Sequence, residues 1–355
     1  MKRTTPFVCA LVPVFSWVLV TCTQTPKKMP AVDGAIIEVR RSDSAIDVGE
    51  PGFDSTLQLY WLGTACHLIQ LGHAQVLTDP FVTNRLRLNN LVSDPARVDV
   101  TLGRIPVPDA VIINHSHHDH ILDAYGAMTQ SAWANVPLYG SVSAKNLLAG
   151  WQQPSITTRC HEITVSGQAF SPSTNAPGYR ITITPYLSKH APHLKCGLTF
   201  LNGKITSPRT SPPSSVFDFQ CGEVYNYLID IRSPAKSFKV FYLGAPYDLE
   251  ELPNSVPDNV AVDVVLALAP SAGNVPGYPQ QHLGRLKPRH VVLSHFNSFT
   301  KEDPDAMGMP KSDIPGLSRA IQSTFSSNPR FEKLHIPAIT ILEPNKKARN
   351  VIQIH

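Results

Sequence analysis

The sequence lacks several features that mark common functional classes. It has no excess of one charge, with 31 Lys and Arg against 27 Asp and Glu, and no basic stripe with interleaved aromatics. Nucleic acid is therefore not an expected partner. No G-x-S-x-G motif, P-loop or dinucleotide fingerprint occurs, so a serine hydrolase, a P-loop NTPase and a Rossmann domain have no support. Without a CxxC pair, a zinc site built from cysteines is not expected.

The N-terminus has no apolar run of the ~20 residues that a membrane-spanning helix needs. The apolar run over residues 7–20 follows two basic residues and predicts a cleaved export signal over residues 1–21. The stretch "LVTC" ends in Cys22 and resembles a bacterial lipobox. That resemblance implies an exported cell-envelope lipoprotein, in the periplasm or outer membrane, tethered through Cys22. The alternative is an ordinary export signal with a chance cysteine.

Short apolar runs separated by turn residues follow from residue 56 onward. They predict strands at 57–63, 66–72, 74–80, 109–115, 137–142, 179–186, 224–231, 238–244, 262–268, 290–296 and 335–343. Helices are expected over 121–134, 143–150 and 314–325, and an irregular excursion over 82–106. This alternation favours the α/β class, with two sheets and helices outside, in one domain over residues 56–355. Residues 22–55 are expected to form a tether and lead-in.

Beyond the lead-in the chain has only four cysteines, at positions 66, 160, 196 and 221. An even number permits disulfides in an exported chain. Cys196 and Cys221 flank a stretch rich in proline, serine and threonine, so a bridge between them is expected to close that loop. The alternative is four buried free thiols, which pack as small apolar residues.

The stretch "VIINHSHHDH", residues 111–120, places four histidines and one aspartate directly after an apolar strand. Neutral imidazole and carboxylate are preferred ligands of Zn²⁺ and similar cations. Four imidazoles and a carboxylate exceed the needs of one metal with an open position, so the stretch favours two metals completed by distant residues. A surface histidine tract is the alternative, but this one lies between a predicted buried strand and a predicted helix.

The pattern HxHxDH after a buried strand resembles the metallo-β-lactamase superfamily over roughly residues 56–343. The resemblance implies a four-layer αββα sandwich with metals at one edge between the sheets. The upstream stretch "WLGTACHLIQLGHAQVLTDPF" is similar to one branch, which includes N-acyl-phosphatidylethanolamine phospholipase D and L-ascorbate-6-phosphate lactonase. By this resemblance, Asp79 in "LTDP" is a structural aspartate near the metals.

The histidine motif implies four metal ligands by the same resemblance. His115 and His117 would hold the first metal, and Asp119 and His120 the second. Asp119 is also the expected catalytic residue, because it could orient the attacking hydroxide.

Two later motifs imply one further ligand each. The stretch "SKHAPH" offers His190 as the ligand, with His193 as the alternative. The stretch "HVVLSHF" offers His295, since His290 stands at the start of that strand and is expected at its opposite end.

The fourth motif is where the sequence departs from the superfamily. The superfamily often has Gly-Asp-Thr here, with an aspartate that bridges both metals. The corresponding stretch is "FYLGAPYDL", which has Ala245 at the aspartate position and Asp248 three residues later. One metal could therefore be lost or held more weakly.

The motifs together predict hydrolysis by a metal-bound hydroxide, because a divalent metal with an open position lowers the pKa of bound water toward ~7. One or two Zn²⁺ ions are expected, with Mn²⁺ or Fe as alternatives. The branch resemblance implies a phosphodiester or phospholipid-like substrate, and a lactone or other cyclic ester is the alternative. A β-lactam is less favoured. Ala245 leaves open a degenerate metal-binding protein without turnover.

Supporting residues and loops are predicted less sharply. Asn297 could bind substrate, and Tyr186 and Asp123 are candidates for supporting the ligands. The loop over 269–288 is expected to be flexible and to line the pocket rim with Tyr278 and His282. The loop over 196–222 could form a lid. The alternative for both loops is an ordinary exposed connection.

Overall fold

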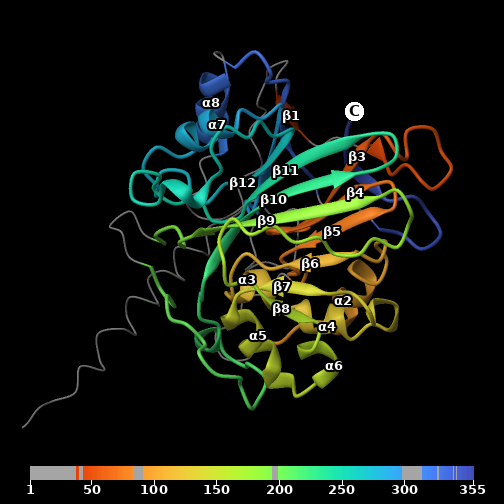
Figure 1. Cartoon of the computed structure of the whole chain (residues 1–355), viewed down its shortest axis with the longest axis vertical. Coiled ribbons are helices and arrows are strands. Elements are labelled where there is room, and N and C mark those ends of the chain that lie inside the picture. The colour runs from red at the N-terminus through yellow and green to blue at the C-terminus, as the bar shows by residue number, and fades with distance from the viewer. Residues whose placement is uncertain are drawn as a thin grey trace, which may run out of the picture.

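The computed structural model describes residues 37–39, 43–83, 91–193, 199–297, 314–325, 328–338, 340 and 342–355. Two β-sheets pack against each other in the described part, with helices on their outer faces (Figure 1). This is the predicted α/β, four-layer αββα sandwich. The predicted export signal over 1–21 and its Cys22 lie outside the described residues.

The first sheet is built mainly from the N-terminal half. Its eight strands run in the order β2 (Asp43–Ser44), β15 (Arg349–Ile354), β3 (Leu57–Gly63), β4 (Cys66–Leu71), β5 (Ala74–Thr78), β6 (Ala110–Ile112), β7 (Leu138–Gly140) and β8 (Cys160–Glu162). The pairs from β2 to β5 are antiparallel, and those from β5 to β8 are parallel.

The second sheet is built mainly from the C-terminal half. Its seven strands run in the order β1 (Ile37–Val39), β14 (Lys333–Ile336), β13 (His290–Ser294), β12 (Val264–Leu268), β11 (Ser237–Leu243), β10 (Val224–Arg232) and β9 (Arg180–Ser188). The halves exchange strands, because β1 joins the C-terminal sheet and β15 joins the N-terminal one. The end of the lead-in thus contributes β1 and β2 to the two sheets.

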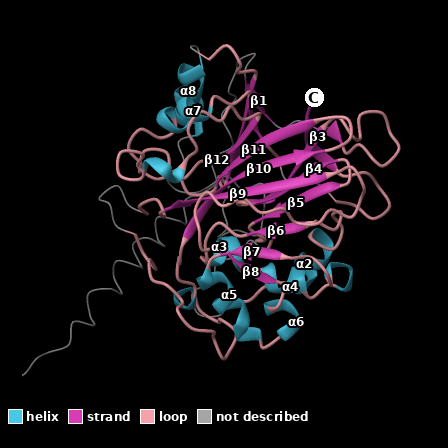
Figure 2. Cartoon of the chain, viewed as in Figure 1, coloured by secondary structure: helices cyan, strands magenta, loops and turns pink. Residues whose placement is uncertain are grey.

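The helices divide between the two outer faces (Figure 2). One group comprises α2 (Pro95–Thr101), α3 (His118–Ile121), α4 (Ala124–Met128), α5 (Val142–Leu148) and α6 (Pro154–Thr157). The other comprises α7 (Gln280–Leu286) and α8 (Ile314–Phe325). Single 3₁₀ turns are Ser131–Trp133, Ala149–Trp151, Val216–Asp218 and Pro253–Ser255.

Alternation along the strands separates the three apolar layers. In β6, Ala110 and Ile112 face the layer between the sheets, whereas Val111 faces the layer under α2 to α6. In β12, Val264 packs between the sheets and Val265 packs under α7 and α8. Since successive side chains of a strand point to opposite faces, strands buried on both faces read as continuous apolar runs.

Most predicted elements are confirmed within two or three residues, and four predictions are wrong. The excursion expected to be irregular over 82–106 contains helix α2, which Asp94 caps at its N-terminus. The helix expected over 121–134 is broken into α3, α4 and a 3₁₀ turn. The strand expected over 335–343 is β14, which ends at Ile336, and the last strand is β15. The expected flexible loop over 269–288 contains α7, and Tyr278 and His282 in it are buried in the core.

None of the helices in the described residues is both long and apolar enough to cross a membrane.

Candidate metal centre

The predicted ligands follow the carboxyl ends of strands from both sheets. Residues 113–120 follow β6 of the first sheet, while His190 follows β9 and His295 follows β13 of the second. Ring centroids of His115 and His190 lie 4.8 Å apart, and those of His120 and His295 lie 5.3 Å apart. The structure therefore brings all six predicted ligands into one group. We call it the ligand cluster: His115, His117, Asp119, His120, His190 and His295.

The ligand cluster has two sides. On one side, nitrogen atoms of His117, His190 and His193 lie within 4.8 Å of one another. We call it the His115 side, because His115 faces His117 there. On the other side, which we call the Asp119 side, ligand atoms of Asp119, His120 and His295 lie within the same distance. The residues on each side have the donor types that hold Zn²⁺ and similar cations.

Asn114 fixes the proton of the first histidine. Its amide nitrogen donates to the Tyr225 carbonyl at 2.5 Å, so its side-chain oxygen faces His115 Nδ1, at 2.7 Å. His115 Nδ1 must therefore donate, and Nε2 keeps the lone pair. Gly244 permits this arrangement, because a Cβ there would lie 2.6 Å from the Asn114 amide nitrogen.

A backbone carbonyl fixes the proton of His117 in the same way. His117 Nε2 donates to the Leu201 carbonyl at 3.2 Å, which leaves the lone pair on Nδ1. His117 Nδ1 and His115 Nε2 are only 3.0 Å apart. Two lone pairs facing each other at this distance repel unless a cation lies between them.

A shared proton does not supply that cation near neutral pH. Burial lowers the pKa of His117 to about 3, and it lowers the pKa of His115 well below the ordinary value, with the neighbouring imidazoles adding to the effect. Both rings therefore stay neutral. A divalent metal between the two nitrogens would remove the repulsion of their lone pairs. Neutral imidazoles that present lone pairs are also the donors that zinc and similar cations prefer.

Hydrogen bonds also distinguish His190 from His193. His190 Nδ1 donates to the Ala191 carbonyl at 2.6 Å, which leaves Nε2 free to bind a metal. His193 Nδ1 instead accepts from the Phe200 N–H at 3.1 Å, so in the neutral ring the other nitrogen carries the proton. These tautomers favour His190 as the ligand.

The Asp119 side is supported by buried polar groups. Asp79 accepts hydrogen bonds from His120 Nδ1 and from the Tyr242 hydroxyl, and its second oxygen accepts from the Asn114 N–H at 2.6 Å. His120 thus keeps a lone pair on Nε2. Asp79 is the supporting aspartate that the sequence predicts near the site. His295 Nε2 lies 3.1 Å from Asp119 Oδ2.

The electrostatics of Asp119 suit a metal ligand. Burial acts to raise the pKa of this carboxyl, but the surrounding imidazoles, chiefly His118 and His120 and then His295, outweigh it and hold the pKa well below its ordinary value. Asp119 is therefore ionised across the neutral range. His118 itself packs between the rings of Phe81 and Phe219 and belongs to neither side of the ligand cluster.

His295 occupies a strained backbone position at the end of β13, with a φ of 59°. Its N–H donates to the Thr64 carbonyl at 2.8 Å, and Asn297 Oδ1 accepts from the Thr64 N–H at 2.9 Å. Asn297, which the sequence analysis names as a residue that could bind substrate, is 1% exposed and braces the turn between β3 and β4 against the strand that carries His295.

The other predicted supporting residues lie outside the ligand cluster. Asp123 accepts from the backbone N–H groups of Val82 and Thr83, at 2.6 and 2.7 Å, and so holds the loop after β5. Tyr186 packs 6.0 Å from the Phe241 ring. His290 is at the opposite end of β13 from His295, as predicted, and pairs with Glu332 at 3.2 Å.

Ala245 provides no ligand, and its neighbour in sequence does not replace it. The Ala245 carbonyl accepts from Ser188 Oγ at 2.8 Å, and its N–H donates to Asn226 Oδ1 at 3.0 Å. Asp248 accepts from the Glu250 N–H at 2.9 Å and belongs to no metal-binding group among the described residues.

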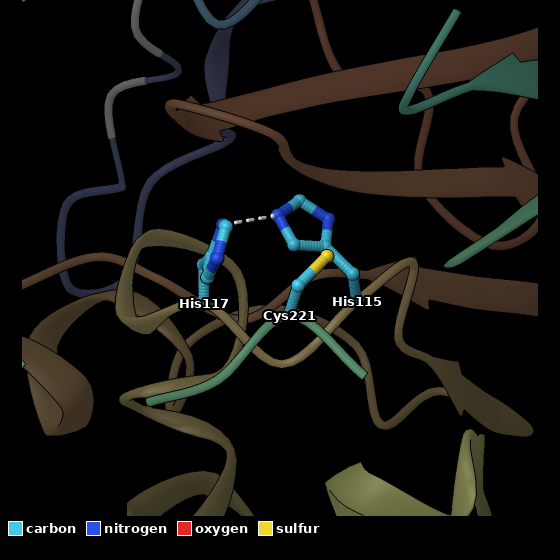
Figure 3. A group of neighbouring side chains, drawn as sticks. All are labelled: His115, His117 and Cys221. Atoms are coloured by element: carbon cyan, nitrogen blue, oxygen red, sulfur yellow. Dashed lines mark hydrogen bonds between the residues drawn. The ribbon is translucent and has the colours of Figure 1, made fainter. Parts of the chain in front are cut away.

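Cys221 is the site residue that the sequence analysis misread. It is a buried free thiol, so the bridge predicted with Cys196 is wrong, and Cys196 itself lies outside the described residues. Its sulfur lies within 4.8 Å of the ligand nitrogens of His115 and His117 (Figure 3). The sequence signal for this was its position just before β10, which begins at the edge where β9 ends.

Comparisons with known proteins found similar sequences and structures. Residues 58–194 match the family model described as "Beta-lactamase superfamily domain". An uncharacterized protein of Mycobacterium tuberculosis (strain H37Rv) is 36% identical over 73 residues, 20% of this chain and 19% of that protein. A protein of Methylacidiphilum infernorum, described as a metal-dependent hydrolase, is 34% identical over 68 residues, 19% of this chain and 26% of that protein. The matched segment is thus only about a fifth to a quarter of these relatives.

Among solved structures, a metallo hydrolase from Ignicoccus hospitalis aligns with 85% of this chain and 99% of its own, at 16% identity and a TM-score of 0.46. An isothiocyanate hydrolase from Delia radicum gut bacteria aligns with 80% of this chain and 96% of its own, at 13% identity and a TM-score of 0.43.

Proposed function

We propose that this chain belongs to the metallo-β-lactamase superfamily and is a metal-dependent hydrolase that binds one or two zinc ions in the ligand cluster. The observation that carries the proposal is the pair of lone pairs on His115 Nε2 and His117 Nδ1, which face each other 3.0 Å apart in a buried site. Orienting hydrogen bonds on the outer nitrogen of a histidine, such as that from His120 to Asp79, are typical of metal ligands.

Bound metal supplies a Lewis acid that lowers the pKa of a water molecule toward neutrality. The protein's own contribution begins with Asp119, whose ionised carboxylate would hold the metal and could accept a proton or orient a hydrogen-bond donor. His115 and His117 remain neutral, so their lone pairs are available at neutral pH. Asp79 holds the ring of His120 in place by its hydrogen bond.

We further propose a phosphodiester or phospholipid-like substrate. The support is the branch resemblance of residues 61–81 and the lipobox-like stretch that ends at Cys22, which together fit an enzyme held at a membrane surface. Bis(p-nitrophenyl) phosphate hydrolysis tests this, with loss on chelation and recovery with Zn²⁺ as the expected result. Turnover confined to a lactone panel would support the cyclic-ester alternative. Metal binding without any turnover would support the degenerate binder.

Export and lipidation at Cys22 are a separate proposal with its own test. Expressed as the full chain in a bacterium, the protein should fractionate with membranes and take up radiolabelled palmitate. A Cys22→Ala variant should do neither. Equal labelling of both forms would contradict lipidation at this position.

A further inference from the structure

We propose that Cys221 is a metal ligand on the His115 side of the ligand cluster. It would supply from a different segment the anionic ligand that the chain lacks at Ala245. This inference rests on the proposed function only in requiring that the cluster bind a metal. It adds which atom completes the His115 side and which class of metal that side selects.

The position of the sulfur is the first argument. Cys221 Sγ, His115 Nε2 or Nδ1 and a ring nitrogen of His117 lie within 4.8 Å of one another, and all three residues are buried. Figure 3 shows the Cys221 sulfur beside the His115 ring, which a dashed line joins to His117. Cys221 also packs against Ala245 and Val224 in a small apolar cluster. The thiol therefore occupies the neighbourhood of the missing carboxylate.

Backbone hydrogen bonds fix that position. The Cys221 carbonyl accepts from the Ser116 N–H at 2.9 Å, between the two histidines of the pair. The Cys221 N–H donates to the Leu201 carbonyl at 2.7 Å, and the same carbonyl accepts from His117 Nε2 at 3.2 Å. The segment that carries the thiol is thus tied directly to the two imidazoles, independently of any metal.

The spacing suits tetrahedral coordination. With Zn–N near ~2.0 Å and Zn–S near ~2.3 Å, neighbouring ligand atoms lie about 3.3 to 3.5 Å apart. The lone-pair nitrogens of His115 and His117 are 3.0 Å apart, close to this value. The sulfur lies within 4.8 Å of a ring nitrogen of each histidine, at most about 1.3 Å beyond the tetrahedral spacing.

The other buried thiols provide a contrast. Cys160 Sγ donates to the Ile156 carbonyl at 3.3 Å, and Cys66 bonds to the backbone of Phe81. For Cys221, no hydrogen bond to the sulfur is found within the described part of the chain, although ring nitrogens of His115 and His117 lie within 4.8 Å of it. Local hydrogen bonds and packing explain the first two thiols, whereas the third lies between apolar side chains and two imidazoles without a polar partner.

Coordination changes the chemistry of the site in a defined way. The metal–sulfur bond forms as the thiol loses its proton to solvent, so zinc binding should release one more proton in the wild type than in a variant without the thiol. A thiolate is a soft ligand and favours Zn²⁺ or Co²⁺ over Mn²⁺ or Mg²⁺. The inference therefore selects zinc among the metals that the histidines alone would accept.

Cobalt substitution tests the inference without relying on activity. The full chain, loaded with Co²⁺, should show a thiolate-to-cobalt charge-transfer band in the near ultraviolet beside the weaker visible bands of bound cobalt. Cys160→Ala is the matched control, because it removes a buried thiol that belongs to no metal-binding group among the described residues, and it should keep the band. Cys221→Ala should lose the band and bind Zn²⁺ at least ~100-fold more weakly, beyond the usual effect of losing an outer partner of a ligand.

Each outcome decides the matter. Visible cobalt bands without a charge-transfer band in the wild type would overturn the inference, and this measurement does not depend on any variant folding. Retention of the band in Cys221→Ala would overturn it as well, as would a failure to bind cobalt at all. Chelator-sensitive hydrolysis without the band would rule out Cys221 as a ligand and still support the proposed function. The band without any hydrolysis would support Cys221 as a ligand and contradict the proposed hydrolase function.

Discussion

The two sides of the ligand cluster differ in the chemical type of the residues that could bind a metal. The Asp119 side has a carboxylate among its ligands and a second one, Asp79, behind His120. The His115 side has neutral imidazoles oriented by an amide and a backbone carbonyl, with the Cys221 thiol beside them. Ala245 packs beside Cys221, so the missing carboxylate leaves its position next to the thiol of the His115 side. Under the proposed function, water activation would fall to the Asp119 side, which has the ionised oxygen.

The largest expected effect comes from breaking the Asp119 side. Asp119→Ala removes both a ligand and the proton acceptor, so hydrolysis should fall by roughly 10³-fold or more. Metal content should fall by about one equivalent, because the His115 side retains its ligands. Steady-state kinetics and elemental analysis of the same preparation check this. Unchanged metal content with lost activity would confine Asp119 to proton transfer.

Removing the support behind His120 should have a smaller effect. Asp79→Asn cannot accept the His120 proton equally well, and loss of such an outer partner typically weakens metal binding by about 10–100-fold. Competition with a chromophoric chelator measures it. Asp248→Asn is the control, because Asp248 lies outside every metal-binding group in the described residues and should change nothing. Equal affinity in wild type and Asp79→Asn would contradict the account.

Acid should act on the His115 side of the metal-free protein. The pKa of His117 is about 3 when folded and 6.5 in the reference state, so the unfolded chain binds more protons between these values. Stability is thus complete above pH 6.5 and falls as the pH drops toward 3, by up to about 1.4 kcal/mol per pH unit from this ring alone. Urea titrations across this window measure it. His117→Gln should flatten the slope, and an identical slope would show that the ring does not titrate as described.

The smallest effect concerns the two candidate ligands that the sequence left open. His190→Ala should weaken zinc binding by about tenfold or more, whereas His193→Ala should change it by less than about threefold, because the His193 tautomer points a proton rather than a lone pair at the site. The reversed order would assign the third motif to His193.

Much of the site could be predicted because the histidine motif is contiguous. Residues 115–120 follow a strand with no intervening choice of loop, so their place at a sheet edge follows from the apolar run before them. Cys221 could not be placed in this way. It meets His115 through backbone hydrogen bonds between distant segments, such as the Tyr225 N–H to the Asn114 carbonyl at 2.9 Å and the Ser116 N–H to the Cys221 carbonyl at 2.9 Å, which no local pattern encodes.

In the fold, too, elements set by a local sequence pattern could be predicted, whereas elements set by contacts between distant residues could not. Helix α8 has the predicted bounds, since Ile314, Leu317 and Ile321 form one apolar face. The helix expected over 121–134 is interrupted at Asp123, because the Asp123 carboxylate accepts hydrogen bonds from the N–H groups of Val82 and Thr83 in the loop after β5. The exchanged strand β15 was missed, because its partner β3 lies almost the whole chain away.

Metal content of the purified chain tests the central claim most directly. After dialysis against Zn²⁺ and removal of free ion, elemental analysis should find two equivalents in the wild type and about one in Asp119→Ala. Absence of bound transition metal in the wild type, with the protein folded, would contradict the account, because the facing lone pairs of His115 and His117 would then need another explanation.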